Sequence, residues 1–349
     1  MIRGLSRDSI EKLDDIFSGA SSAVISTHAH PDGDAIGSSL ALTRYLLSRG
    51  LKAHVILPDP CPETLSFIVD DTLSPLVLTE AEGIKEALGG ANILVSIDYN
   101  SPHRTDALEK SIRQFKGIKV LIDHHIAPEE SFFDLVISKP DISSSCELLY
   151  YVLLGMKDID GKPERLGVET GTELLLGMTT DSNNFANSTY PSTLEMAGEL
   201  IAAGVDRDSL LQKLYNRYRE NRYRFMGYFL SEKMKITPQG VAYAVLSAEE
   251  IRRFGIRDGE TEGFVNMPLG MENVRMSLFL KEEDNREKMR VSIRSKAGTS
   301  ANKFASTYFN GGGHEQASGG KLSMPSEVSS AKDAEEYIVK CAEDFFSQA

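Results

Sequence analysis

The sequence predicts an α/β fold with an N-terminal parallel-sheet αβα domain and a smaller C-terminal α/β domain. Three observations support this prediction: strand and helix patterns alternate through residues 1–190, the pattern changes near residue 235, and 349 residues suffice for two domains. Residues 191–234 look helical and are expected to connect the two domains, so the second domain is predicted to span 235–349.

The predicted strands of the first domain are short runs rich in Val and Ile. Their apolar residues are nearly continuous, which is typical of parallel strands that are buried on both faces. Helical stretches between them complete the βαβ pattern of an open parallel sheet. The predicted strands are 23–26, 53–57, 93–97, 118–122 and 135–137, and the predicted helices are 35–48, 81–88, 102–115, 144–154 and 167–178.

The second domain is predicted to have strands at 241–246, 274–280 and 288–295 and helices at 302–309 and 331–346. Between these helices lies a segment, 310–320, with five glycines in eleven residues. Glycines allow backbone to approach a ligand closely and to adopt positive φ. His314 within this segment favours a phosphate contact over a flexible linker, and Arg294, twenty residues earlier, is expected to reach the same site.

Composition excludes several classes of protein. The net charge of −13 argues against a protein that tracks long nucleic acid, because such proteins need a basic surface. The charged N-terminus and the lack of an apolar run of ~18 residues argue against a signal peptide and a membrane span. Three well-separated cysteines fit a reducing compartment, so a cytoplasmic location is expected.

Candidate metal ligands follow several of the predicted strands. Three of them lie in one short loop after the first strand, and others follow the third and fourth strands. Ligands in open α/β sheets bind at the carboxyl ends of strands, so these separated segments are expected to converge at one edge. The candidate ligands are His28, Asp32, Asp34, Asp98, His124 and Asp181.

With Asp98 as a bridge, this set can supply two adjacent divalent metals. Carboxylate-rich sites with one imidazole per ion suit Mn²⁺, with Mg²⁺ as an alternative and Zn²⁺ less suited. Two metals a few ångströms apart serve in-line phosphoryl displacement. The sequence therefore predicts two Mn²⁺ ions and phosphoryl chemistry.

Each of these signals has a simpler alternative. The Asp-Gly-Asp loop could be an ordinary turn, and Asp98 and Asp181 could cap helices. His30 lies in the same loop but outside the ligand pattern. Arg104 could contact phosphate or be a solvated helix residue. The Arg/Tyr-rich stretch 217–224 could bind RNA by stacking, although a solvated helix with an aromatic stripe is the favoured interpretation.

Taken together, these residues resemble the DHH phosphoesterase superfamily. The loop His28-x-x-Pro31-Asp32-Gly33-Asp34 resembles the first motif of that family, and Asp98 the second. Asp123-His124-His125 is the signature that gives the family its name, and Asp181 resembles the fourth motif. Gly311-Gly312-Gly313-His314-x-x-Ala317-x-Gly319 resembles the DHH-associated C-terminal domain. The chain is similar to the oligoribonuclease (nano-RNase) and pAp-phosphatase branch, except that Ser182-Asn183 follow Asp181 where that branch often has Thr-Gly.

The resemblance implies a role for each matching residue. His28, Asp32 and Asp98 would hold one metal, and the second would be held by Asp34, Asp98, His124 and Asp181. Asp123 would orient its neighbours or be a weak metal ligand, and His125 would act on the phosphate as a stabiliser or proton donor. Substrate would be bound in a cleft between the domains, with contacts expected from Arg104, Arg294, Gly312, Gly313 and His314.

The predicted function is an Mn²⁺-dependent phosphoesterase that hydrolyses short RNA oligonucleotides to mononucleotides and 3′-phosphoadenosine 5′-phosphate to AMP. The alternatives are an exopolyphosphatase or pyrophosphatase, a phosphodiesterase of linear or cyclic dinucleotides, and a nucleotide sensor without catalysis. The expected partners are short oligonucleotides or small phosphorylated nucleotides, without long nucleic acid or membrane. The sequence leaves open whether the chain forms a homodimer.

Overall fold

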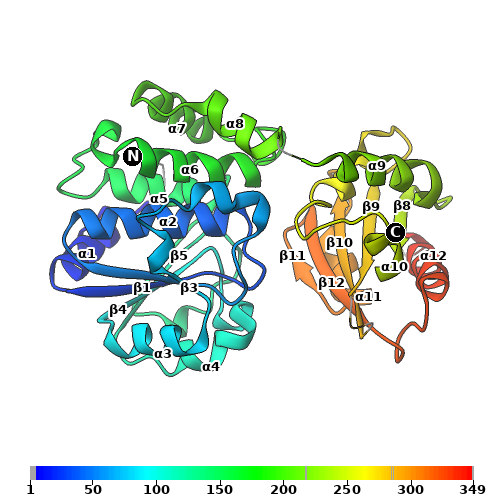
Figure 1. The fold of residues 1–349 in the computed structure, drawn as a ribbon, viewed down its shortest axis with the longest axis horizontal. Helices are drawn as coiled ribbons and strands as arrows, with labels where there is room; N and C mark the ends of the chain where they lie inside the picture. The colour runs from blue at the N-terminus through cyan, green and yellow to red at the C-terminus, as the bar shows by residue number, and fades with distance from the viewer. Residues whose placement is uncertain (1–4, 217, 284, 286, 348–349) are drawn as a thin grey trace. The chain divides into compact units, whose positions relative to one another are not determined.

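The computed structural model describes residues 5–216, 218–283, 285 and 287–347. The chain forms two compact units, Met1–Arg217 and Tyr218–Ala349, each with its own six-stranded sheet (Figure 1). The predicted α/β fold, with a parallel sheet in the first unit and a separate sheet in the second, is confirmed. In the part of the chain that is described, no helix combines the length and apolarity needed to cross a membrane.

The sheet of the first unit is parallel throughout and has the strand order β3-β2-β1-β4-β5-β6. All five residues of β4 are buried, as expected for a strand covered on both faces. Strand order reverses between β1 and β4, which is where open α/β sheets bind ligands, beyond the carboxyl ends of the strands. The strands are β1 Ser22–Ser26, β2 Lys52–Ile56, β3 Val77–Leu78, β4 Ile93–Ile97, β5 Ile118–Asp123 and β6 Leu135–Ser138.

Helices cover both faces of this sheet (Figure 1). The larger apolar core joins one face to helices α1, α2, α5 and α6, and a smaller core joins the opposite face to α3 and α4. Short 3-10 helices occupy several connections: η1 Glu63–Ile68, η2 Ser74–Leu76, η4 Glu130–Phe132 and η5 Pro163–Leu166. The α-helices are α1 Arg7–Ser18, α2 Gly33–Ser48, α3 Ala81–Gly90, α4 Glu109–Arg113, α5 Ser145–Leu154, α6 Val168–Asp181, α7 Pro191–Ala202 and α8 Arg207–Tyr215.

Helices α2 and α6 pack unusually closely because glycines line their contact. A Cβ atom on Gly37 would lie 2.4 Å from the carbonyl oxygen of Glu173 in α6, and one on Gly177 would lie 2.8 Å from Asp34 Oδ1 in α2. The same helices are joined by a buried ion pair, in which Arg44 Nε and Nη2 donate to Glu173 Oε1 at 3.0 and 2.7 Å. This close contact fixes the positions of α2 and α6 relative to one another, including the start of α2 and the end of α6.

The second unit has a mixed sheet with the strand order β11-β12-β10-β9-β8-β7. Only β8 and β9 pair in parallel, and the other neighbours are antiparallel. One face packs on α11 and α12, and the other packs on α9, α10 and η7. The strands are β7 Lys235–Ile236, β8 Val241–Leu246, β9 Met276–Glu282, β10 Lys288–Ser295, β11 Gly312–Gly313 and β12 Ala317–Ser323; the helices are α9 Glu220–Tyr228, η6 Phe229–Lys233, α10 Ala248–Arg253, η7 Phe264–Gly270, α11 Ala301–Tyr308 and α12 Ala331–Ser347.

Two segments differ from the sequence prediction. Residues 102–115 do not form one helix. They form the 3-10 helix η3 Pro102–Leu108, which is kinked at Asp106 with φ 45°, followed by the short helix α4. The glycine-rich segment 310–320 is partly strand, since β11 and β12 pair with one another. A Cβ on Gly311 or Gly320 would meet the carbonyl oxygens of Gly319 and Phe309, so these two glycines serve close backbone packing.

In the Arg/Tyr-rich stretch, the central arginine, Arg222, makes its contacts within the second unit. The guanidinium of Arg222 is buried, donates to the carbonyl oxygens of Glu260 and Glu262, and lies 3.9 Å from the ring centroid of Tyr218. Arg219 Nε donates to Glu260 Oε1 at 2.8 Å. Arg217 lies outside the described residues. These internal contacts agree with the favoured structural interpretation and leave less positive charge for RNA.

The glycine contact between α2 and α6 leads to a first testable prediction. Gly177→Ala should destabilise the protein by about 1–3 kcal/mol, because the new methyl group would overlap Cys146 Sγ and the Asp34 carboxylate. Gly198→Ala, in the interior of α7, is the matched control: nothing lies within 4 Å of its added Cβ, so stability should be kept or slightly increased. Urea unfolding of both variants measures the difference, and equal stability of the two would contradict the packing argument.

Candidate metal centre

His28 lies in the loop after β1, and one nitrogen of its ring already has a hydrogen-bond partner. His28 Nδ1 lies 2.8 Å from the carbonyl oxygen of Ala29, which can only accept, so Nδ1 carries the proton. Nε2 is thereby left as the metal-binding nitrogen, and it lies 3.5 Å from Asp98 Oδ2 and 4.0 Å from Asp32 Oδ1. The geometry suits one ion between these three side chains.

Asp32 has a structural role as well as a possible metal-binding one. Its Oδ1 accepts hydrogen bonds from the backbone N–H groups of Asp34 and Ala35 at 2.9 and 3.1 Å, which makes it the N-cap of α2. The Asp-Gly-Asp segment is thus the start of a helix and not an ordinary turn. The cap fixes the carboxylate in front of the helix, where it also faces His28.

Asp98 lies between two imidazoles. It follows β4 in the left-handed region, with φ 63°, and its N–H still bonds the carbonyl oxygen of Ile122 at 3.1 Å. Asp98 Oδ2 faces His28 Nε2, and Asp98 Oδ1 lies 3.6 Å from His124 Nε2. Because each oxygen faces a different histidine, one carboxylate can serve two ions.

The second group of side chains gathers around His124. Its Nε2 lies 3.5 Å from Asp181 Oδ2, 3.6 Å from Asp98 Oδ1 and 3.9 Å from Asp34 Oδ2. Asp34 opens α2 and Asp181 ends α6, so the close packing of these helices brings both carboxylates here. Gly33 contributes to the approach, since its Cβ would lie 2.3 Å from Thr180 Oγ1.

The electrostatics of this cluster fit divalent cations. Burial, together with neighbouring carboxylates, raises the pKa of Asp34 to about 6 and raises the pKa of Asp98 well above its ordinary value. Burial lowers the pKa of His28 and His124, and the charge of Arg104 lowers that of His28 further. The sets His28–Asp32–Asp98 and Asp34–Asp98–His124 each gather their ligand atoms within 4.8 Å. Buried acids beside neutral imidazoles match the oxygen and nitrogen donors that Mn²⁺ prefers.

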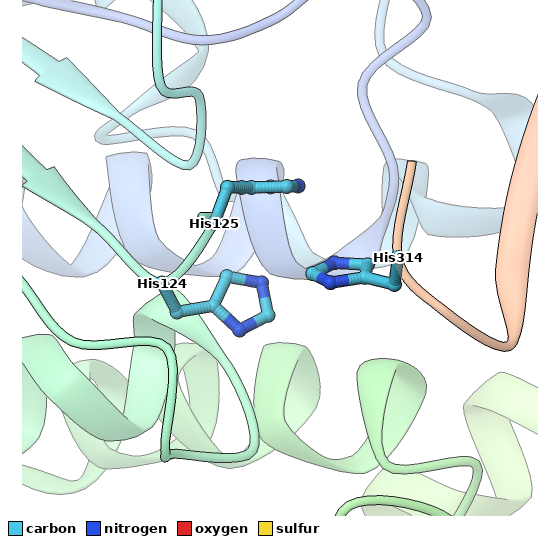
Figure 2. A group of neighbouring side chains, drawn as sticks. All are labelled: His124, His125 and His314. Atoms are coloured by element: carbon cyan, nitrogen blue, oxygen red, sulfur yellow. The ribbon is translucent and has the colours of Figure 1, made fainter. Parts of the chain in front are cut away.

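Asp123 and His125 form a separate pair beside the candidate ligands. His125 Nδ1 bonds Asp123 Oδ1 at 2.7 Å, and the Asp123 side chain is completely buried at the end of β5. The bond holds the ring so that Nε2 points to the opposite side. Figure 2 shows the side chains of His124 and His125 beyond the end of this strand. Their ring planes meet at 71°, and their centroids lie 4.8 Å apart.

The conformation of Ser182 and Asn183 shows how these residues fit where the similar branch often has Thr-Gly. Asn183 has φ 48°, in the left-handed region that glycine adopts readily and that asparagine tolerates better than most residues. The Ser182 hydroxyl accepts a hydrogen bond from the N–H of Phe185 at 3.1 Å. Ser182-Asn183 thus form a turn in which Asn183 has a positive φ, a conformation that a glycine would adopt without strain.

Several buried hydroxyls next to the ligands were missed by the sequence analysis. Ser145 Oγ donates to Asp98 Oδ1 at 2.9 Å. The phenol of Tyr99 lies 2.5 Å from Ser26 Oγ and donates to Ser96 Oγ at 2.6 Å, below the loop that carries Asp98. The only signal in the sequence was the serine run 143–145 before a helix, which indicates an N-cap and not what the cap faces.

The candidate substrate residues lie in both units. Arg104 is exposed in η3, and its carbonyl oxygen accepts from the N–H of Ala29, which ties η3 to the His28 loop. In the second unit, Arg294 of β10 pairs with Ala317 of β12, and the N–H of His314 donates to the carbonyl oxygen of Ala317 at 2.8 Å. Gly312 and Gly313 form β11 alongside.

The glycines of β11 differ in what surrounds them. Gly313 has φ 141°, and a Cβ there would lie 2.7 Å from the carbonyl oxygen of Ala317, so only glycine fits. Gly312 has nothing within 4 Å of an added Cβ, which leaves its backbone open on that side. Gly312 and Gly313 precede the short turn 314–317, His314 begins it, and Arg294 pairs with its last residue, Ala317.

Comparison with known proteins agrees with these motifs. Residues 22–178 match the DHH family N-terminal domain, and residues 239–345 match the DHHA1 domain. The bifunctional oligoribonuclease and PAP phosphatase NrnA of Thermus thermophilus is 31% identical over 307 residues, which cover 85% of this chain and 83% of the relative.

Solved structures show the same fold. An exopolyphosphatase-related protein from Bacteroides fragilis superposes with a TM-score of 0.89 and 32% identity, over 99% of this chain and 98% of that one. RecJ from Thermus thermophilus, solved in complex with Mn²⁺, has a TM-score of 0.57 and 14% identity. That match covers 100% of this chain and 56% of RecJ, and it shows a shared fold.

Proposed function

The chain belongs to the DHH family and is a metal-dependent phosphoesterase, and we propose that it hydrolyses short RNA oligonucleotides to mononucleotides and 3′-phosphoadenosine 5′-phosphate to AMP. The observation that carries the metal part of this proposal is Asp98, whose two carboxylate oxygens face two different histidines. The similarity to NrnA, which spans most of both chains, supports the substrate part.

We propose Mn²⁺ as the cofactor, with Mg²⁺ as an alternative. His28, Asp32 and Asp98 would hold one ion, and Asp34, Asp98, His124 and Asp181 would hold the other. A set with several carboxylate oxygens and one imidazole for each ion suits Mn²⁺ better than the sulfur-rich sets that select zinc. Mn²⁺ is also the ion bound in the RecJ structure of similar fold.

A divalent pair in such a site supplies a water of lowered pKa and neutralises charge on the phosphate. The chain itself supplies orientation and proton handling. The buried carboxylate of Asp123 holds Nδ1 of His125, which leaves Nε2 of the same ring as the nitrogen that would face the phosphate. His125 would stabilise the developing negative charge or protonate the leaving oxygen from that nitrogen.

The substrate would be held by residues outside the ligand set. Arg104 places a fixed positive charge within electrostatic reach of His28 and can donate to phosphate oxygens. Arg294 and His314 would bind a terminal phosphate of the substrate, with the backbone of Gly312 and Gly313 beside it. These contacts would favour binding of a short substrate, because a few fixed cations can bind only a few phosphates.

The global charge supports a small substrate. A net charge of −13 opposes the extended phosphate contacts that a long strand requires. We propose a cytoplasmic location, which the three free cysteines fit.

A second candidate function is hydrolysis of polyphosphate or pyrophosphate. The Bacteroides fragilis structure that matches this chain over almost its whole length is described as exopolyphosphatase-related. The same donor set can serve any phosphoanhydride, so the substrate-binding residues must decide between the two functions. Dinucleotides are a further alternative within the phosphodiester class.

Removal of the shared carboxylate tests the metal part of the proposal. Asp98→Ala should lower turnover of every substrate by roughly 10³-fold or more, since a bound ion contributes several kcal/mol to transition-state stabilisation. Asp71→Ala, at an exposed aspartate outside the candidate site, is the control and should keep full activity. Calorimetric titration with Mn²⁺ should show weaker binding only in Asp98→Ala. Near-normal turnover of that variant would rule out the shared-ligand model.

A substrate panel tests the choice of substrate. With Mn²⁺ present, kcat/KM for RNA of two to five nucleotides and for 3′-phosphoadenosine 5′-phosphate should exceed that for long single-stranded DNA by at least ~10²-fold, with only a modest effect of salt. Polyphosphate and cyclic dinucleotides complete the panel. A higher kcat/KM for polyphosphate would favour the second candidate function, and processive digestion of long DNA would contradict both.

The role of the second unit is tested by replacing its candidate phosphate contacts. His314→Ala or Arg294→Ala should lower kcat/KM by roughly a hundredfold while Mn²⁺ affinity is kept, because a phosphate would lose its charged partner. Arg290→Ala, on the same strand but paired to Glu283 at 2.9 Å, is the matched control. If the losses follow melting temperature, or if Mn²⁺ binding is lost, the two residues do not act on the substrate.

A further inference from the structure

Helix α5 begins directly against the candidate metal ligands. The N–H of Ser145 donates to Asp34 Oδ2 at 2.6 Å, and the N–H of Cys146 donates to Asp34 Oδ1 at 2.9 Å. Both oxygens of this carboxylate are therefore occupied by the first turn of the helix. The side chain of Ser145 extends the contact to the neighbouring ligand, because its Oγ donates to Asp98 Oδ1 at 2.9 Å.

These contacts are sealed from solvent. Ser145 and Cys146 are completely buried, and Asp34 and Asp98 are only 1% and 2% exposed. Water cannot replace the hydrogen bonds, so the protein donors alone set the orientation of the two carboxylates. Gly177 makes the close approach feasible, since a Cβ there would lie 2.8 Å from Asp34 Oδ1.

The serine turn that precedes α5 is itself fixed by hydrogen bonds to the buried Glu147. Ser143 donates to Glu147 Oε2 through both its N–H, at 3.1 Å, and its hydroxyl. Thr193 Oγ1 donates to the same oxygen at 2.7 Å, and Ser144 Oγ accepts from the N–H of Glu147 as the N-cap. Glu147 is completely buried. The turn is thus fixed to both α5 and α7, and Ser145 has little freedom to move.

Resting on the proposed function, we propose that Ser145 is a positioning residue that holds the shared Asp98 carboxylate, and with its own N–H the Asp34 carboxylate, in the orientation that binds the second metal ion. The hydrogen bond from Ser145 Oγ takes one lone pair of Asp98 Oδ1 and restrains rotation of the carboxylate. The remaining lone pairs then face the two histidines. Outer hydrogen bonds of this kind tune metal affinity by about 10–100-fold.

The alternative is that Ser145 only begins and packs helix α5. A buried serine on α2, Ser39, provides the matched control, because its hydroxyl donates only to the carbonyl oxygen of Ile36 at 3.0 Å. Ser145→Ala and Ser39→Ala each remove one buried hydroxyl, but only the first removes a donor to a carboxylate. A purely structural role would give both variants the same behaviour toward metal.

The test measures Mn²⁺ binding by calorimetry and melting temperature in EDTA for the wild type, Ser145→Ala, Ser145→Thr and Ser39→Ala in the full chain. Ser145→Ala should raise the Mn²⁺ dissociation constant by about 10–100-fold, and higher Mn²⁺ should recover part of its kcat. Ser39→Ala should bind Mn²⁺ like the wild type. Ser145→Thr keeps the hydroxyl and should stay within about threefold, which retains a test if Ser145→Ala does not fold.

Unchanged Mn²⁺ affinity in Ser145→Ala, or an equal loss in Ser39→Ala, would overturn the positioning role. So would a Ser145→Thr variant that folds but binds as weakly as Ser145→Ala. These outcomes leave the proposed function intact, because the wild type still binds Mn²⁺. A wild-type chain that binds no divalent ion would instead refute the proposed function and this inference together.

Discussion

The crowding of buried carboxylates at one edge of the parallel sheet is the constraint on which the rest of the first unit depends. Asp34 and Asp98 are almost fully removed from water, and burial together with neighbouring carboxylates raises the pKa of both. Such an arrangement is unfavourable without a cation or strong hydrogen-bond donors. The fold provides hydrogen-bond donors from α5 and places two imidazoles beside these carboxylates, an arrangement that could hold a divalent ion.

Glycine packing makes this crowding feasible. Gly33, Gly37 and Gly177 remove the methyl groups that would otherwise separate α2, α5 and α6, and the Arg44–Glu173 ion pair holds the same helices together. The strand order adds the second requirement, since β1, β4 and β5 are neighbours and end at the same edge. Helix contact and sheet topology therefore position the candidate ligands together, although the ligands are separated by more than a hundred residues in the chain.

The second unit uses glycine for a different purpose. Gly311 and Gly320 allow backbone to pack against backbone at the turn between α11 and β12, and Gly313 permits the left-handed path of the short strand β11. The expectation that these glycines serve a ligand was thus incomplete, because most of them are required by the fold. Gly312 alone among the glycines of β11 keeps an open side. It pairs with Gly319 of β12, two residues beyond Ala317, the partner of Arg294.

The sequence by itself determined the α/β class, the parallel sheet of the first unit and the residues that gather at its edge. It could do so because buried parallel strands have a continuous apolar pattern, and because ligands of open sheets follow the strands directly. It did not determine the break at Asp106, the strand β12, or the role of Asn183 in place of glycine, since these depend on local φ values and on partners distant in sequence.

Only the tertiary structure decided which donors hold the carboxylates. Ser145 lies 47 residues from Asp98 and 111 from Asp34 in the chain, and nothing in its local sequence distinguishes it from an ordinary residue at the start of a helix. Its contacts arise because α5 packs against α2 and α6 with its first turn toward the sheet edge. A hydrogen bond between distant segments depends on how helices pack, and packing is a property of the whole core, so no short stretch of sequence specifies it.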